Sequence, residues 1–155
     1  QYASQLAGQI RAELADLNFL ETNFDLEVTE SAPLSANGFD EACFLISMNP
    51  GSPMRMLGDV ASGGELSRIM LAIKTVLADK DQTETLIFDE IDVGISGRTA
   101  QKVSEKMAVI ARSRQVLCIT HLAQIASMAD HHYYIEKNVA GVRNDLALMV
   151  SGESV

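Results

Sequence analysis

The chain has 155 residues, of which 47% are hydrophobic, so it can bury one ordinary core, and length alone predicts a single folding unit. Its formal net charge is −9, whereas binding to a phosphate backbone calls for clustered Lys and Arg, so these residues are not expected to grip DNA by themselves. The sequence shows neither a secretory signal nor a long apolar stretch free of charges, so export and membrane spanning are not supported.

The first 20 residues predict an amphipathic helix. Apolar residues recur at steps of three and four with polar residues between them, at Tyr2, Leu6, Ile10, Leu14, Leu17 and Leu20. Two interpretations of this helix stay open, a helix that packs onto the core of the domain and the last turns of a coiled-coil arm. Because the chain begins at Gln1, inside this helical pattern, we expect a C-terminal portion of a longer protein, with residues 21–155 forming one lobe.

Two strand-like runs follow at residues 24–29 and 42–48, and turn-forming residues around Pro33, Asn37 and Gly38 separate them, so a hairpin is expected. Cys43 lies in the second run and Cys118 in a later apolar run. This placement favours buried structural thiols over a disulfide or a metal pair, which suits a reducing cytoplasm. Residues 49–53 then break the pattern and open a loop.

Helix-like and strand-like segments alternate over the remainder of the chain. We expect a largely buried helix from about residue 62 to 77, strands at 85–88, 116–120 and 132–136, and helices at 97–111 and 122–129. Such alternation predicts an α/β fold with a mostly parallel sheet and helices packed on it. Residues 138–141 resemble a turn, and residues 143–150 a further strand.

The helix from residue 62 begins with a pattern suited to an anion. Ser62 offers a hydroxyl, and Gly63 and Gly64 permit close backbone approach at a helix start, where free N–H groups and the helix dipole favour a phosphate oxygen. Glu65 places a negative side chain in the first turn. A capped helix with a glycine turn would share these features, but the full run VASGGELSRIMLAIK is much more specific.

Asp89 and Glu90 end the apolar strand TLIF, so their carboxylates project at the carboxyl edge of the sheet, where ligands bind in open α/β folds. Asp89 is the candidate Mg²⁺ ligand, and Glu90 the candidate general base or water-orienting group, as in P-loop-type ATPases. Solvated acids at a strand end are the alternative, and the upstream SGGE favours the functional interpretation. No GxxxxGK[ST] loop occurs in the sequence, so the nucleotide's own phosphate cradle is expected elsewhere.

Two further polar residues follow strands or loops of this region. Capping of the next helix explains Ser96 but not Asp92, which we assign to a loop that crosses a subunit interface. His121 directly follows the strand VLCIT, so it is expected at the same carboxyl edge, near a bound γ-phosphate. His131 and His132 lack such a context and are taken as ordinary strand-edge residues.

Four segments together resemble the C-terminal ATPase lobe of the RecN family, SMC-like bacterial proteins of DNA double-strand-break repair: SMNPG, VASGGELSRIMLAIK, TLIFDEIDVGISGRTAQKV and QVLCITHLAQIASMADHHYYIEK. They cover most of the chain from about Phe44, whereas the tail VAGVRNDLALMVSGESV departs from the family pattern. The resemblance implies the C-terminal lobe of an ABC/SMC-type ATPase head, which joins an N-terminal lobe that carries Walker A and a coiled coil between the lobes.

The family pattern implies that two heads sandwich ATP with Mg²⁺, and that the isolated lobe is inactive. It assigns γ-phosphate contact in the partner protomer to Ser62, Gly63, Gly64 and Glu65, Mg²⁺ to Asp89, water activation to Glu90, the D-loop acid to Asp92 and the switch histidine to His121. The implied partners are the N-terminal head lobe, a second head in a homodimer, and DNA through other parts of the protein, with no membrane. The implied location is the cytoplasm, at the nucleoid.

Two other ATPase classes and a non-catalytic class stay open. A head lobe of another SMC-like or RecF-like ATPase would share these motifs. A transporter nucleotide-binding domain usually carries a Pro-Thr-Ser-type run after the catalytic Glu, whereas Ile91, Asp92 and Val93 follow Glu90 here, and its signature more often has Gln where Glu65 stands. A non-catalytic interaction module describes these residues taken alone.

Overall fold

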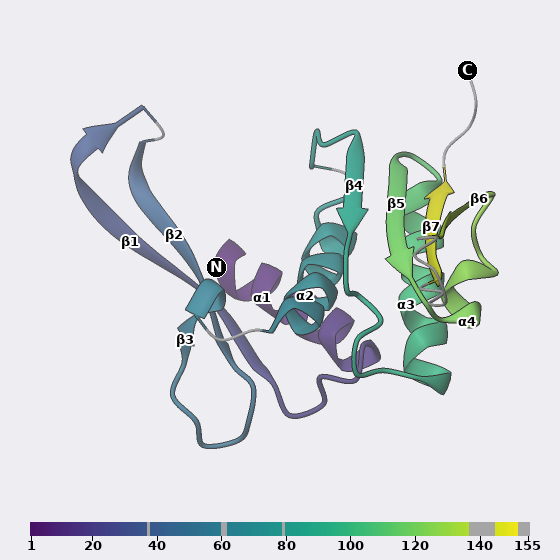
Figure 1. Cartoon of the computed structure of the whole chain (residues 1–155). Coiled ribbons are helices and arrows are strands. Elements are labelled where there is room, and N and C mark those ends of the chain that lie inside the picture. The colour runs from purple at the N-terminus through teal and green to yellow at the C-terminus, as the bar shows by residue number, and fades with distance from the viewer. Residues whose placement is uncertain (37, 60–61, 79, 137–144, 152–155) are drawn as a thin grey trace. The chain divides into compact units, whose positions relative to one another are not determined.

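The computed structural model describes residues 1–36, 38–59, 62–78, 80–136 and 145–151 (Figure 1). Length alone predicts a single unit, but the chain divides into two compact units, an N-terminal unit of Gln1–Ala61 and a C-terminal unit of Ser62–Val155. Each unit has its own sheet, and no strand described is shared between the two sheets. Among the described residues, no helix has both the length and the apolarity that a membrane span needs.

The N-terminal unit is built on a hairpin. It contains α1 (Tyr2–Asp16), β1 (Asn23–Ser35), β2 (Gly38–Ser47), β3 (Arg55–Met56) and the short 3-10 helix η1 (Leu57–Asp59). β1 and β2 pair antiparallel from Asn23 opposite Ser47 onward, with an irregular register between Glu30 and Ser35, and β3 pairs with β2. The predicted hairpin is confirmed, with longer strands than the sequence indicates.

Helix α1 packs against β1 and buries Ala7, Ile10 and Leu14. It ends at Asp16, four residues before the predicted end, because Asn18 adopts the left-handed region at φ 72°. The N–H of Asn18 donates to the Ala15 carbonyl, and the N–H of Phe19 donates to the Leu14 carbonyl, so the last carbonyls of the helix are satisfied by a Schellman-type end.

The C-terminal unit combines helices with a four-stranded sheet. Its elements are α2 (Gly63–Val76), β4 (Thr85–Phe88), α3 (Gly97–Ala111), β5 (Gln115–Thr120), α4 (Ala123–Ala126), β6 (His131–Glu136) and β7 (Asp145–Ser151). The strand order is β4-β5-β7-β6, with β4 parallel to β5 and β7 antiparallel to both of its neighbours. Three of these four strands therefore share one direction, and the predicted α/β fold with helices packed on a sheet that contains parallel strands is confirmed. Of the three strand pairs described, β4 with β5 is parallel, and the two pairs that β7 makes are antiparallel. The turn predicted at residues 138–141 lies outside the described residues.

Alternating residues of β4 and β5 form the buried side of this sheet. Leu86, Phe88, Val116 and Cys118 are buried, whereas Ile87 between the first two is 68% exposed. Helix α3 packs against β5, α2 and α4. Both cysteines are free thiols, and burial, followed by the charges of Asp92 and Asp89, raises the pKa of Cys118 to about 12. Cys118 is thus the buried structural thiol that the sequence predicts.

Candidate functional site

The first turn of α2 closes on itself through Glu65. The Ser62 N–H and hydroxyl both donate to Glu65 Oε2, at 3.1 and 2.8 Å, while the Leu66 N–H donates to the Ser62 carbonyl at 2.7 Å. Ser62 is the extended N-cap residue, and Ser62 and Gly63 are exposed. A helix start of this kind is suited to an anion, and in this structure the Ser62 hydroxyl is held by Glu65 in a capping box.

Gly63 and Gly64 lie directly against the loop that follows β4. A Cβ added at Gly64 would stand 2.8 Å from the Glu90 carbonyl oxygen and 3.1 Å from the Val93 Cβ, and one at Gly63 would collide with the Glu90 carboxylate. Gly64 is therefore required by packing against the backbone of this loop, in addition to any phosphate contact, whereas at Gly63 only the end of the Glu90 side chain would have to move. The sequence predicts that the glycine motif and the carboxylates after β4 both serve a nucleotide site, but it does not predict that the two motifs touch.

Asp89 and Glu90 follow β4 and are exposed at its carboxyl end, as the sequence predicts. Glu90 adopts the left-handed region at φ 57°, which costs a non-glycine residue about 1–3 kcal/mol and is kept only where the surroundings impose it. Asp89 offers the hard carboxylate oxygen that Mg²⁺ prefers. Since Mg²⁺ usually takes one or two protein carboxylates together with substrate phosphates, this single exposed ligand fits such an ion.

Two side chains of α2 hold this loop. The Ser67 hydroxyl donates to the Asp89 carbonyl at 2.6 Å, and Arg68 Nη1 donates to the carbonyls of Ile91 and Val93, at 3.1 and 2.8 Å. Arg68 is only 7% exposed, and desolvation lowers its pKa against the opposing charges of Glu65 and Asp92. Sequence reasoning missed Arg68. The signal was available, because Arg68 shares a helix face with the buried Leu71 and Ala72.

Asp92 is turned into its own chain, toward the end of β5. It is 3% exposed, and its Oδ2 accepts from the Thr120 hydroxyl at 2.5 Å and from the His121 N–H at 2.8 Å. The imidazole Nδ1 of His121 lies 3.1 Å from the same oxygen, while the His121 side chain is 61% exposed. The structure thus brings Asp92 and His121 together, an arrangement that orients the histidine ring.

The eight predicted site residues therefore gather at the carboxyl ends of β4 and β5 and the adjoining start of α2. His131 and His132 begin β6, are exposed, and stand apart from these contacts. No group of three metal-ligating side chains occurs within the part of the chain that the structure describes, so further ligands for a cation at Asp89 would come from a nucleotide, water or other protein segments.

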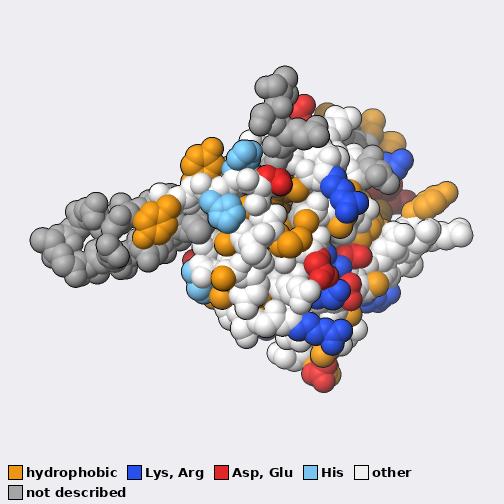
Figure 2. Space-filling view, turned by 90° about the vertical axis from the view of Figure 1, so that its right-hand side faces the viewer, with side chains coloured by type: hydrophobic (Ala, Val, Ile, Leu, Met, Phe, Trp, Pro, Cys, Tyr) orange, Lys and Arg blue, Asp and Glu red, His pale blue; other side chains and the backbone are white. Residues whose placement is uncertain are grey.

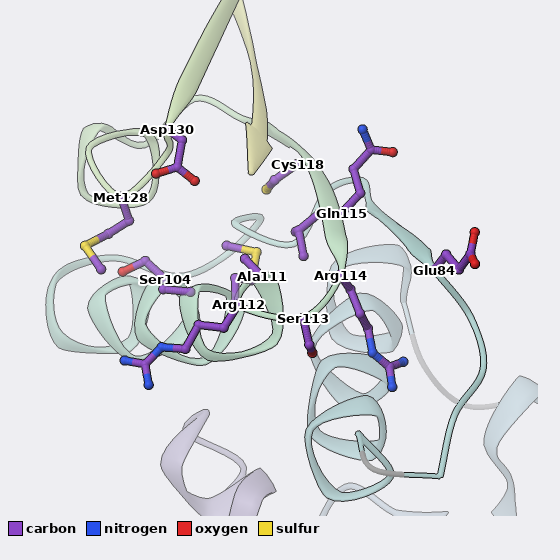
Figure 3. A pocket seen from close by; sticks show the side chains of 13 residues that line it. Glu84, Ser104, Ala111, Arg112, Ser113, Arg114, Gln115, Cys118, Met128 and Asp130 are labelled. Atoms are coloured by element: carbon purple, nitrogen blue, oxygen red, sulfur yellow. The ribbon is translucent and has the colours of Figure 1, made fainter. Parts of the chain in front are cut away.

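A hollow in the C-terminal unit is separate from this site. It measures 820 Å³ and is lined mainly by the end of α3 and the start of β5, with the side chains of Arg112, Arg114 and Gln115 around it (Figure 3). None of the predicted site residues lines it. On the face in Figure 2, the basic and acidic side chains of the described residues lie among one another, so these residues form no continuous basic patch for a phosphate backbone there.

Comparison with known proteins gives strong sequence similarities, although no protein-family model matches the chain. The chain is 46% identical over 147 residues to the DNA repair protein RecN of Halalkalibacterium halodurans, covering 92% of this chain and 26% of that protein. It is 44% identical over 153 residues to RecN of Bacillus subtilis, covering 89% of this chain and 27% of that protein. This chain is similar to a segment of RecN. It spans about a quarter of the length of these RecN relatives.

Solved structures agree on the fold. The Smc head domain with an extended coiled coil from Pyrococcus furiosus superposes with a TM-score of 0.60 at 18% identity, over 93% of this chain and 34% of that chain. The Smc head domain with a coiled coil and joint from Pyrococcus yayanosii gives the same TM-score at 19% identity, over 96% of this chain and 26% of that one. The RecN-like chain therefore has the fold of part of an Smc head domain.

Proposed function

We propose that these residues form the C-terminal lobe of the head of a RecN-type DNA-repair ATPase. In this proposal the lobe supplies four motifs to ATP held between two heads: the signature motif VASGGELSR, the Walker B segment TLIFDE, the D-loop with Asp92 and the switch histidine His121. Walker A and the coiled coil belong to other parts of the same protein. The protein acts in the cytoplasm at the nucleoid, and DNA binds elsewhere on it, in keeping with the net charge of −9 of this lobe.

One observation carries the proposal. Three motifs far apart in the sequence, residues 62–65, residues 89–92 and His121, meet at one edge of the C-terminal unit through the contacts of Gly64 with Glu90 and of Asp92 with His121. Phosphoryl transfer needs groups that position water and neutralise phosphate charge, and little covalent chemistry. The groups that this reaction uses are an anion-binding helix start (the anion seat, Ser62 to Glu65), two exposed carboxylates and an oriented imidazole.

Each group has a distinct task in this proposal. Glu90 orients the attacking water, His121 presents its ring toward the γ-phosphate, and Asp89 holds Mg²⁺, which would neutralise charge on the phosphates when bound. Asp92 holds His121 in its own chain, and its loop also reaches the partner head. The first turn of α2, from Ser62 to Glu65, meets the γ-phosphate bound by the partner.

Glu90→Gln in the full-length protein tests the proposal. The substitution removes the carboxylate that orients water and leaves Asp89 and the α2 contacts in place, so ATP should bind and persist while steady-state hydrolysis falls by about two to four orders of magnitude. Glu84→Gln is the matched control, because Glu84 is exposed and directly precedes β4, at the opposite end of that strand. Near-normal turnover by the Glu90 variant would refute the assignment.

A further inference from the structure

Helix α2 and the loop of residues 89–93 are joined through alternate carbonyls of the loop. The carbonyl oxygen of Asp89 accepts from the Ser67 hydroxyl, and those of Ile91 and Val93 both accept from Arg68 Nη1. Glu90, which is in the left-handed region, lies between the anchored carbonyls of Asp89 and Ile91. The conformation of Glu90 is therefore fixed from both sides by two consecutive residues of α2.

Burying the charged guanidinium of Arg68 to satisfy two carbonyls has a large desolvation cost. Its guanidinium is removed from solvent at 7% residue exposure, and burial lowers its pKa, which shows that the environment opposes the charge. A neutral side chain would cost less desolvation. The guanidinium differs from other donors in its rigid planar fork, which can hold two acceptors in fixed positions. The two carbonyls that it holds belong to Ile91 and Val93, the residues directly before and after Asp92, in the loop just beyond Glu90.

We propose that Arg68 is a positioning residue for hydrolysis: from the helix that carries the anion seat, it holds the loop that carries Glu90. The inference rests on the proposed function of Glu90. Arg68 touches neither nucleotide nor water in this role. It acts by keeping the Glu90 carboxylate at the place where water must be oriented, and it ties that place to the start of α2, where the partner's phosphate arrives.

The role makes a specific kinetic expectation. Arg68→Met in the full-length protein keeps the apolar stem and removes the donors, so kcat should fall by about a hundredfold, the size of effect that a displacement of about 1 Å can cause. The KM for ATP should stay within about twofold. Arg68→Lys keeps the charge without the fork and should give an intermediate loss. Arg112→Met, the same substitution at an exposed position beyond α3, should leave kcat unchanged.

Hydrogen exchange supplies a readout in the nucleotide-free protein. Peptides that cover residues 88–96 should exchange faster in Arg68→Met than in the parent protein or in Arg112→Met, while α3 and β5 keep their protection. If Arg68→Met fails to fold, Arg68→Lys carries the same comparison. Unchanged exchange in the loop together with unchanged kcat would overturn the inference.

A double-mutant cycle with Glu90→Gln separates positioning from a general structural effect. If Arg68 acts through Glu90, Arg68→Met should lower the residual hydrolysis of Glu90→Gln by no more than about twofold, a strongly non-additive result. Additive losses would overturn the inference and leave the role of Glu90 intact. A Glu90→Gln variant that hydrolyses ATP normally would instead refute the proposed function, and the inference with it.

Discussion

Replacing Gly64 with alanine tests whether the signature glycines are required by packing against their own chain. The added Cβ would stand 2.8 Å from the Glu90 carbonyl oxygen and 3.1 Å from the Val93 Cβ, whereas ordinary van der Waals contact begins at 3.4 Å. The loop would have to move by roughly half an ångström, and overpacking of this kind costs about 1–3 kcal/mol. Alanine returns about 0.5–1 kcal/mol through its better helix propensity. A net loss of local stability is therefore expected.

Two other glycines provide matched comparisons. A Cβ at Gly8 in α1 meets only Arg11 Nη2, at 3.9 Å, so Gly8→Ala should stabilise α1 by about 0.5–1 kcal/mol. At Gly63 the collision involves the end of the Glu90 side chain, which can rotate. Gly63→Ala should therefore leave the stability of α2 nearly unchanged and still lower hydrolysis, because the carboxylate is displaced.

Hydrogen exchange of the full-length protein measures these local opening free energies in peptides that cover α1 and α2. The expected order of stability change is Gly8→Ala positive, Gly63→Ala near zero and Gly64→Ala negative. Stabilisation of α2 by Gly64→Ala as large as that of α1 by Gly8→Ala would show that the loop does not pack on this glycine.

Three further predictions concern binding, assembly and reactivity. Residues 1–155 alone should not bind Mg-ATP appreciably, because Asp89 and Glu90 offer negative charge to a negative ligand, and micromolar affinity in calorimetric titration would contradict this. Ser62→Arg in the full-length protein should preserve ATP binding by single heads and abolish head dimerisation and hydrolysis. Mixing it with a variant defective only in Walker A should restore part of the ATPase activity. Loss of ATP binding by folded monomeric heads would show that the anion seat acts in its own protomer. Cys118, with its pKa raised to about 12, should be about one part in ten thousand thiolate at pH 8 and resist iodoacetamide until the protein unfolds, so rapid labelling of the native protein followed by mass spectrometry would refute its burial.

The sequence predicts elements well where local signals decide them. Helix α3 begins and ends where the sequence predicts, with Ser96 at its N-cap position although the Ser96 side chain makes no capping hydrogen bond. The hairpin of β1 and β2 follows from strand patterns and turn residues. Helix α1 ends early because Asn18 adopts a left-handed conformation that periodicity does not reveal. The division into two units also escaped prediction, because it depends on which strands pair.

In the candidate site, too, the sequence predicts the features that local signals decide and misses those that depend on long-range contacts. Strand ends place Asp89, Glu90 and His121 at one edge by topology alone, and the structure has them there. The contact of Gly64 with the loop, the Arg68 bonds to Ile91 and Val93, and the inward turn of Asp92 join residues 23 to 29 positions apart, so no local pattern encodes them. The position of β7 between β5 and β6 is likewise a long-range pairing.

The left-handed backbone at Glu90 sets stability and activity against each other. Such a conformation costs a non-glycine residue about 1–3 kcal/mol, whereas glycine adopts it freely and loses only about 0.5–1 kcal/mol in chain entropy. A library screened for thermal resistance alone would therefore enrich Glu90→Gly, a substitution that relaxes the backbone and removes the carboxylate. Directed evolution of this protein for thermal stability needs simultaneous selection for turnover, because the substitution at residue 90 that relaxes the backbone also removes the carboxylate that hydrolysis requires.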